Sequence, residues 1–216
     1  APEWNMIDFA IQQVGAICIP IYPTISHADY EYIFNHSEAS IVFVTNKHLY
    51  NKVSDIIAST PSIKDVYLIR ASEGIKSLQE LIDLGNENRD EAALEAAKAE
   101  VKNEDVATII YTSGTMGTPK GVMLTHSNIL SVIEYLCPLY PIDETHDTIS
   151  YLPLSHIYER TVQYCHVYLG CSTYYVDNLG AIVETMGEVR PHHFSSVPRL
   201  IEKVYHTIVR KGQKLT

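Results

Sequence analysis

The chain has 216 residues, of which 46% are hydrophobic and 19% charged, as is ordinary for a globular protein with one large domain or two small lobes. Its formal net charge of −10 argues against a non-specific nucleic-acid binder, which needs a broad basic surface. No apolar run approaches the ~20 residues of a membrane-spanning helix. We expect a cytoplasmic protein whose four cysteines, none of them in a Cys-x-x-Cys pair, stay reduced.

Helices and short apolar strands alternate over the first part of the chain. Helices are predicted over residues 4–14, 26–35 and 46–60, and strands over residues 16–20, 40–44 and 65–69. Ser26 and Asn46 are the expected N-cap residues of the second and third helices. This alternation predicts an α/β fold with mostly parallel sheets flanked by helices.

The middle of the chain predicts a boundary between two lobes. A short helix is expected over 77–84, and residues 87–102 form an Ala- and Glu-rich helix with a solvated face. We therefore divide the chain into an incomplete first α/β lobe (1–86), an acidic helical linker (87–104) and an incomplete second α/β lobe (105–216). Within the second lobe, Thr125 is the expected cap of a helix that stops at Pro138. Further strands are predicted over 148–152, 172–176 and 192–197, and further helices over 154–168, 178–189 and 198–212.

The residues between the apolar runs 106–111 and 122–124 suit a polyanion, because they combine glycines, hydroxyls and one lysine. They are not a Walker A loop, since Pro119 precedes Lys120 and Gly121 follows it, and the pattern is strand, loop, strand. The alternatives are a hairpin without a ligand and a solvated surface lysine. Tight hairpins use only about two to five loop residues, whereas this loop is longer and rich in donors.

The run Thr-Ser-Gly-Thr-x-Gly-x-Pro-Lys-Gly resembles the phosphate loop of the adenylate-forming (AMP-binding) superfamily of acyl-CoA synthetases, luciferases and peptide-synthetase adenylation domains. Met116 stands where the family usually has Thr or Ser, which removes one hydroxyl donor. The stretches 151–160 (Tyr-Leu-Pro-Leu-Ser-His-Ile-Tyr-Glu-Arg), 194–205, 2–5 and 21–24 resemble the long-chain fatty acid–CoA ligase (long-chain acyl-CoA synthetase) branch. The resemblance covers nearly the whole chain.

This resemblance implies a two-step ligase that uses ATP, Mg²⁺ and coenzyme A and has a fatty acid as its substrate. The carboxylate attacks the α-phosphate of Mg·ATP, and the thiol of coenzyme A then displaces AMP from the acyl-adenylate. Lys120 is implied as the catalytic cation on the phosphates, and Thr115 as the residue nearest to Mg²⁺ through Mg·ATP; no metal ligand is assigned. The implied nucleotide-binding residues are Thr112, Ser113, Gly114, Thr115, Gly117, Thr118, Lys120 and Gly121.

His156 is the candidate substrate-binding residue, because it follows the carboxyl end of a predicted strand, where ligand sites of α/β proteins gather. We expect it to form a wall of the acyl pocket; the alternative is a core histidine with a satisfied hydrogen bond. Glu159 and Arg160 favour a structural role as charges paired along a helix, and Arg199 suits a helix start and a substrate contact equally. The adjacent histidines 192 and 193 point to opposite faces of a strand, so a metal site is not expected there.

The family's later motifs do not occur in this sequence. These are the Tyr-Gly-x-Thr-Glu segment with its Mg²⁺-binding glutamate, the ribose-binding aspartate, the hinge, and the C-terminal domain with its catalytic lysine. We expect a part of the N-terminal domain that is inactive without that C-terminal domain. Two other possibilities stay open: activation of an amino or aryl acid, and a non-catalytic nucleotide-binding or scaffolding relative. Peripheral membrane contact is a further expectation, because fatty acids reside in membranes. The sequence predicts neither acyl chain length nor oligomeric state.

Overall fold

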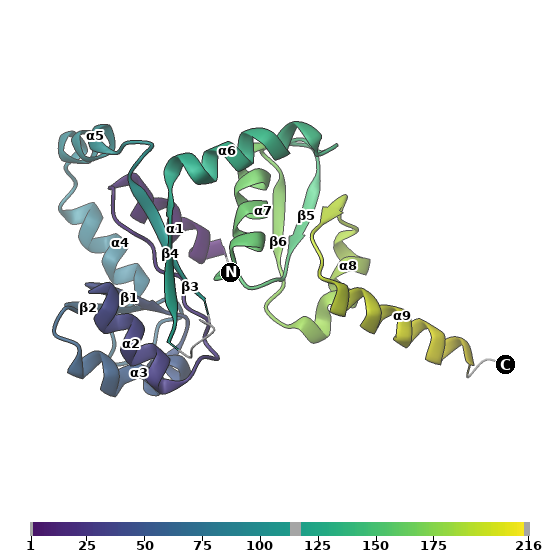
Figure 1. Ribbon diagram of the computed structural model, residues 1–216, viewed down its shortest axis with the longest axis horizontal. Helices are drawn as coiled ribbons and strands as arrows, with labels where there is room; N and C mark the ends of the chain where they lie inside the picture. The colour runs from purple at the N-terminus through teal and green to yellow at the C-terminus, as the bar shows by residue number, and fades with distance from the viewer. Residues whose placement is uncertain (1, 113–117, 214–216) are drawn as a thin grey trace. The chain divides into compact units, whose positions relative to one another are not determined.

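The computed structural model describes residues 2–112 and 118–213 (Figure 1). The chain divides into two compact units, one over residues 2–128 and one from Ile129 onward, and each is described by itself. No helix in the described ranges is long and apolar enough to cross a membrane.

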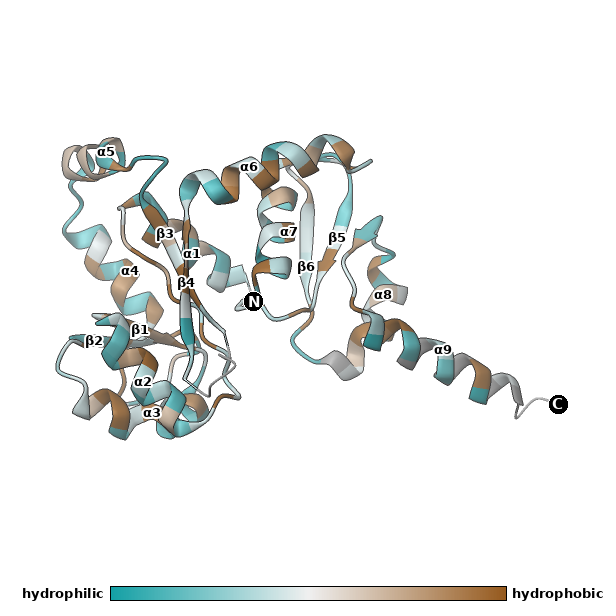
Figure 2. Cartoon of the chain, viewed as in Figure 1, coloured by the Kyte–Doolittle hydropathy of each residue, from teal (hydrophilic) through white to brown (hydrophobic). Residues whose placement is uncertain are grey.

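The first unit contains a two-stranded parallel sheet with helices packed on it, and an antiparallel hairpin. Its elements are α1 (Pro2–Gln13), α2 (His27–Ser37), β1 (Ile41–Val44), α3 (Lys47–Ser59), β2 (Asp65–Leu68), α4 (Leu78–Glu87), α5 (Glu91–Glu100), β3 (Val106–Thr112) and β4 (Lys120–Thr125). β1 pairs in parallel with β2, and β3 pairs with β4. Figure 2 shows that β1 and β3 are largely apolar strands.

The core of the first unit lies between the parallel sheet and helices α2 and α3. Its buried side chains are Tyr30, Phe34, Val42, Val44, Val53, Ile56 and Leu68. The predicted caps Ser26 and Asn46 are confirmed: the Ser26 side chain accepts a hydrogen bond from the backbone N–H of Asp29, and that of Asn46 accepts one from Leu49. These bonds satisfy donors that a helix start otherwise leaves unpaired.

The second unit is built on a three-stranded parallel sheet of order β6-β5-β7. Its elements are the greater part of α6 (His126–Leu136), the 3₁₀ turn Cys137–Leu139, β5 (Asp147–Ser150), α7 (Ile157–Tyr168), β6 (Ser172–Tyr175), the 3₁₀ turn Leu179–Ala181, α8 (Ile182–Val189), β7 (His193–Phe194) and α9 (Pro198–Gln213). α7 and α8 lie on either side of strands β5 and β6 (Figure 1). Ile149 and Tyr151 pack with Ile182 of α8, whereas Ser150 faces α7, as the two-residue period of a strand requires.

The predicted α/β fold with mostly parallel sheets is confirmed, and several element bounds differ from the predictions. Residues 16–20 do not form a strand, because only Cys18 pairs with β3, opposite Thr108; Pro20 has no N–H with which to extend the ladder. The helix expected over 87–102 starts at Glu91, capped by the Asp90 side chain. The segment 178–189 is a 3₁₀ turn followed by α8, and the strand expected over 192–197 is only two residues long.

The compact units also divide at a different point from the predicted boundary. The hairpin β3–β4 was assigned to the second lobe, but it belongs to the first unit. The reason lies in contacts between residues far apart in sequence. The backbone of Cys18 bonds to residues 107 and 109, and His36 bonds to the Tyr111 hydroxyl. These contacts join β3 to the N-terminal part of the chain.

Candidate functional site

The predicted loop lies at the tip of the β3–β4 hairpin. The register pairs Thr112 with Lys120 and Tyr111 with Gly121, so residues 113–119 connect the two strands. This confirms the expected order of strand, loop and strand. Ser113, Gly114, Thr115 and Gly117, together with Met116, lie outside the described residues, and their assignment as phosphate-binding residues stays a prediction.

The structure brings the described ends of the loop together around an open hollow. Thr112, Thr118 and Lys120 are exposed, and Thr112 and Lys120 lie opposite each other in the hairpin. The hollow has a volume of about 420 Å³, and its described lining comprises Tyr32, His36, Thr118, Pro119, Lys120 and Gly121. An exposed ammonium and a hydroxyl beside a hollow of this size provide a cation and a donor for an anionic group.

Tyr32 and His36 were not predicted to belong to this site. Both come from α2, and His36 is 75 residues before its partner Tyr111 in the sequence. The His36 Nδ1 lies 2.7 Å from the Tyr111 hydroxyl. The ring of Tyr32 stacks on that of His36, with centroids 5.2 Å apart and an interplanar angle of 24°. No local sequence pattern signals such a contact, because it arises from the tertiary packing of α2 beside the hairpin.

Gly121 is required by the packing beneath the loop. A Cβ atom at this position would lie 2.8 Å from Cγ2 of Ile109 and 3.4 Å from the Tyr111 ring. Because the branched side chain of isoleucine has few rotamers, it cannot move aside easily.

We therefore expect Gly121→Ala to destabilise the first unit by about 1–3 kcal/mol and to weaken ATP binding. Thermal unfolding followed by Trp4 fluorescence measures the first effect, since Trp4 is the only tryptophan and lies in α1. Gly85→Ala is the matched control, because a Cβ there meets no atom within 4 Å. In the helix α4 that change should stabilise by about 0.5–1 kcal/mol. An unfolding midpoint for Gly121→Ala equal to or above that of the wild type would contradict this account.

His156 belongs to the second unit, where it caps the N-terminus of α7. Its Nδ1 accepts a hydrogen bond of 3.2 Å from the backbone N–H of Tyr158. The residue is exposed, so within this unit it is not a core histidine. The bond holds the ring at the N-terminus of α7, the helix that follows β5 in the chain. The predicted substrate contact of His156 stays a prediction. Arg199, in the first turn of α9, is also exposed.

Glu159 and Arg160 have the structural role that the sequence favoured, but not as a surface ion pair. Both are buried, at 2% and 0% exposure. The Ser150 hydroxyl donates a 2.6 Å hydrogen bond to the Glu159 carboxyl, and the Gln163 amide lies 3.4 Å from the same oxygen. Burial raises the pKa of Glu159 to about 7, although these bonds act in the opposite direction. Arg160 donates through Nε to the Tyr164 hydroxyl at 2.7 Å.

The buried polar contacts of α7 continue to its last turn. The Gln163 amide lies 3.3 Å from Nδ1 of His166, and Nε2 of His166 lies 3.1 Å from Nδ1 of His193. Burial lowers the pKa of His166 to about 4, with a smaller effect from His193. The sequence did not signal this network, since its members are spread over two turns of α7 and over strands β5 and β7.

The adjacent histidines 192 and 193 point in opposite directions, as predicted. Nδ1 of His192 accepts a bond from the backbone N–H of Asp147, whereas His193 faces His166.

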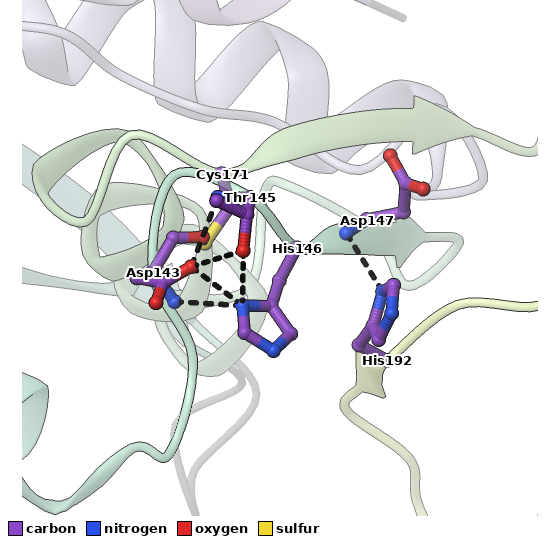
Figure 3. Close-up of polar contacts among 6 residues, drawn as sticks. All are labelled: Asp143, Thr145, His146, Asp147, Cys171 and His192. Atoms are coloured by element: carbon purple, nitrogen blue, oxygen red, sulfur yellow. Dashed lines mark hydrogen bonds and ion pairs between the residues drawn. The ribbon is translucent and has the colours of Figure 1, made fainter.

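Figure 3 shows His192 together with a turn at Asp143, whose carboxylate lies 2.7 Å from Nδ1 of His146. The donors of this turn hold the pKa of Asp143 down to about 2, those of Thr145 first. In residues 2–112 and 118–213, no group of three or more His, Cys, Asp or Glu side chains is arranged to hold a metal ion.

The fold and the loop together define the class of protein. A family model described as AMP-binding enzyme matches residues 1–215, and the chain belongs to this family of adenylate-forming enzymes. The family predicted from the loop motif is therefore confirmed.

Relatives within the family are long-chain acyl-CoA synthetases. The chain is 33% identical to long chain acyl-CoA synthetase 6, peroxisomal, of Arabidopsis thaliana over 96% of its own length and 30% of that protein. It is 32% identical to the long-chain-fatty-acid–CoA ligase FadD15 of Mycobacterium bovis, over 95% of this chain and 34% of the relative. The chain thus spans about a third of the length of these curated relatives.

Solved structures agree with this assignment. The long-chain-fatty-acid–CoA ligase FadD1 from Archaeoglobus fulgidus superposes with a TM-score of 0.82 at 26% identity, over 97% of this chain and 40% of that one. The A domain of a carboxylic acid reductase from Segniliparus rugosus, solved with AMP and a co-purified carboxylic acid, superposes with a TM-score of 0.75. This second match covers all of this chain and 38% of that one at 19% identity. At this identity it shows a shared fold.

Proposed function

We propose that the protein containing this chain activates a long-chain fatty acid with ATP, giving acyl-adenylate and pyrophosphate, and then forms acyl-CoA with release of AMP. The observation that carries the proposal is the described end of the loop, where Thr118 and Lys120 line a hollow and Lys120 pairs with Thr112 across the hairpin. Family membership and the names of the relatives support the reaction class. We further propose that the protein acts in the cytoplasm, with peripheral contact to the membranes in which fatty acids reside.

In this proposal Lys120 stabilises the charge that develops on the phosphates as the carboxylate attacks. Phosphoryl-type transition states are served mainly by positioned cations and hydrogen-bond donors. Thr112, Thr118 and the Gly121 backbone would hold the phosphates together with the predicted loop residues Ser113, Gly114, Thr115 and Gly117. ATP would bring Mg²⁺ to the loop, with Thr115 as the residue of this chain nearest to it.

His156 would contact the acyl chain in the same proposal. The bond from Tyr158 to its Nδ1 leaves the ring at the start of α7, exposed and held in one orientation. Coenzyme A would react after the adenylate has formed, and this chain's sequence assigns no residue to it.

The alternative within the same family is activation of another carboxylate, such as an amino or aryl acid. The acid dependence of ATP–pyrophosphate exchange separates the two, because exchange requires the acid that is activated. For the complete protein we expect exchange with palmitate and little with phenylalanine or benzoate. Exchange with one of the latter alone would favour the alternative, and no exchange with any acid would favour a non-catalytic relative.

We also propose that the 216 residues alone do not form acyl-adenylate, since they lack the motifs that would bind ribose and Mg²⁺. The expected result is pyrophosphate release, with ATP and palmitate, no greater than that of the chain carrying Lys120→Ala. Release clearly above this control would show that the chain suffices for the first half-reaction and would contradict the proposal.

A further inference from the structure

The strand that leads into the phosphate loop is held from outside the loop motif. Tyr111 immediately precedes Thr112, the last residue of β3. Its hydroxyl lies 2.7 Å from Nδ1 of His36 on α2. Its ring also meets the rings of Tyr32 and His36 edge-on, at interplanar angles of 87° and centroid distances of 6.4 and 5.8 Å. Tyr111 is therefore fixed both by a hydrogen bond and by two aromatic contacts.

Two of these residues, Tyr32 and His36, belong to the hollow that Lys120 also lines. Tyr32 and His36 line it together with residues 118–121. On the opposite strand, Gly121 pairs with Tyr111, and the space for a Cβ at Gly121 is taken by Ile109 and the Tyr111 ring. Because Tyr111 pairs with Gly121 and Thr112 with Lys120, we expect a shift of Tyr111 to be transmitted to Gly121 and Lys120 through the β3–β4 ladder. Partial burial raises the pKa of Tyr111, so its hydroxyl keeps its proton and can donate at neutral pH.

We propose that His36 is a positioning residue for the phosphate loop: by its hydrogen bond to Tyr111 it holds the two ends of the loop, and with them Lys120, in the geometry that binds the polyphosphate of ATP. The inference rests on the proposed function, since it assumes that the hollow receives phosphate groups. It adds a residue from a helix that the loop motif does not include. His36 acts through Tyr111 and needs no contact with the nucleotide.

The test measures the dissociation constant of ATP for the complete protein by calorimetry, and the KM for ATP and kcat in exchange. His36→Phe keeps a ring for stacking on Tyr32 but removes Nδ1. We expect ATP to bind about tenfold more weakly, the loss that one hydrogen bond typically brings, with the change in KM rather than in kcat. His36→Asn, whose side chain can place a polar atom near the position of Nδ1, should restore most of the affinity.

A double-mutant cycle separates positioning from general loss of structure. Tyr111→Phe should weaken ATP binding to a similar degree, and the double variant should be no weaker than the weaker single variant, because both changes remove one interaction. His48→Phe, at an exposed histidine of α3 in the same unit, is the matched control and should leave the affinity unchanged. The thermal unfolding midpoint should agree among these variants.

Each outcome decides the inference. If the wild type binds ATP and His36→Phe binds it equally well, or if the two single changes simply add, the positioning role is wrong while the proposed function stands. If His36→Phe lowers the unfolding midpoint and affinity alike and His36→Asn restores neither, the residue is merely structural. If the wild type does not bind ATP, the proposed function fails and the inference fails with it.

Discussion

Lys120→Ala is expected to lower the rate of palmitate-dependent ATP–pyrophosphate exchange by about 10²–10³-fold in the complete protein, the typical loss when one preorganised donor is removed from a developing charge. Lys120 is exposed at the first position of β4, across the hairpin from Thr112, and it lines the hollow at the loop. The chain carries a formal net charge of −10, and a polyanion is therefore drawn by local cations and not by the overall field.

Two variants make this prediction specific. Lys102→Ala removes an exposed lysine near the start of the same hairpin and should leave exchange within about twofold of the wild type. Lys120→Arg keeps the charge but changes the geometry of its donors, and should retain an intermediate rate. Since the altered side chain is exposed, the unfolding midpoint should not change. If Lys102→Ala and Lys120→Ala lost the same activity, the loop lysine would have no special role.

The residues that could be identified from the sequence were those whose role depends on a short stretch of chain. The caps Ser26 and Asn46 and the hairpin that holds Lys120 each depend on fewer than about twenty neighbouring residues, and their local patterns are strong. The loop motif was specific enough to give the family, because glycines, hydroxyls and a lysine at these spacings are seldom combined except to bind phosphate.

The residues that could not be identified act through contacts between distant parts of the chain. Nothing around His36 indicates that it meets Tyr111, and nothing around Cys18 indicates that it pairs with Thr108. The predicted lobe boundary at residues 87–104 precedes the division between the compact units at residues 128 and 129 for the same reason. Its position depends on whether the β3–β4 hairpin contacts the first unit or the second. Glu159 was expected to pair with nearby charges along its own helix, whereas its actual partner Ser150 lies on another element.

The buried polar network of α7 predicts a compensated pH dependence of stability in the second unit. Burial raises the pKa of Glu159 from its ordinary value of 4.5 to about 7. The folded state then binds a proton that the unfolded state has lost, so this residue's contribution is full below pH 4.5 and is lost as the pH rises through 7. Burial lowers the pKa of His166 from 6.5 to about 4. Its contribution is full above pH 6.5 and is lost as the pH falls through 4.

These two effects oppose each other between about pH 4.5 and 6.5, where the wild type should show only a weak dependence on pH. Each difference of about 2.5 pH units corresponds to at most about 3 kcal/mol at 1.36 kcal/mol per unit. Glu159→Gln keeps a neutral side chain of the same shape and removes the decrease of stability with pH that Glu159 causes. The stability of this variant should therefore rise by about 2–3 kcal/mol from pH 4.5 to pH 6.5.

His166→Gln removes the increase of stability with pH that His166 causes, so the stability of that variant should fall from pH 4.5 to pH 6.5. The partly buried His193, whose pKa is also lowered by burial, adds to the His166 slope and reduces this fall. Amide hydrogen exchange at Ile149, buried in β5, reports on the second unit, while Trp4 fluorescence reports on the first and should show no difference among the three proteins. The two substitutions should change the pH dependence of stability in opposite directions. A general loss of packing would not do this, so it cannot explain the expected result. Parallel pH profiles for all three proteins would mean that neither group titrates as its burial requires.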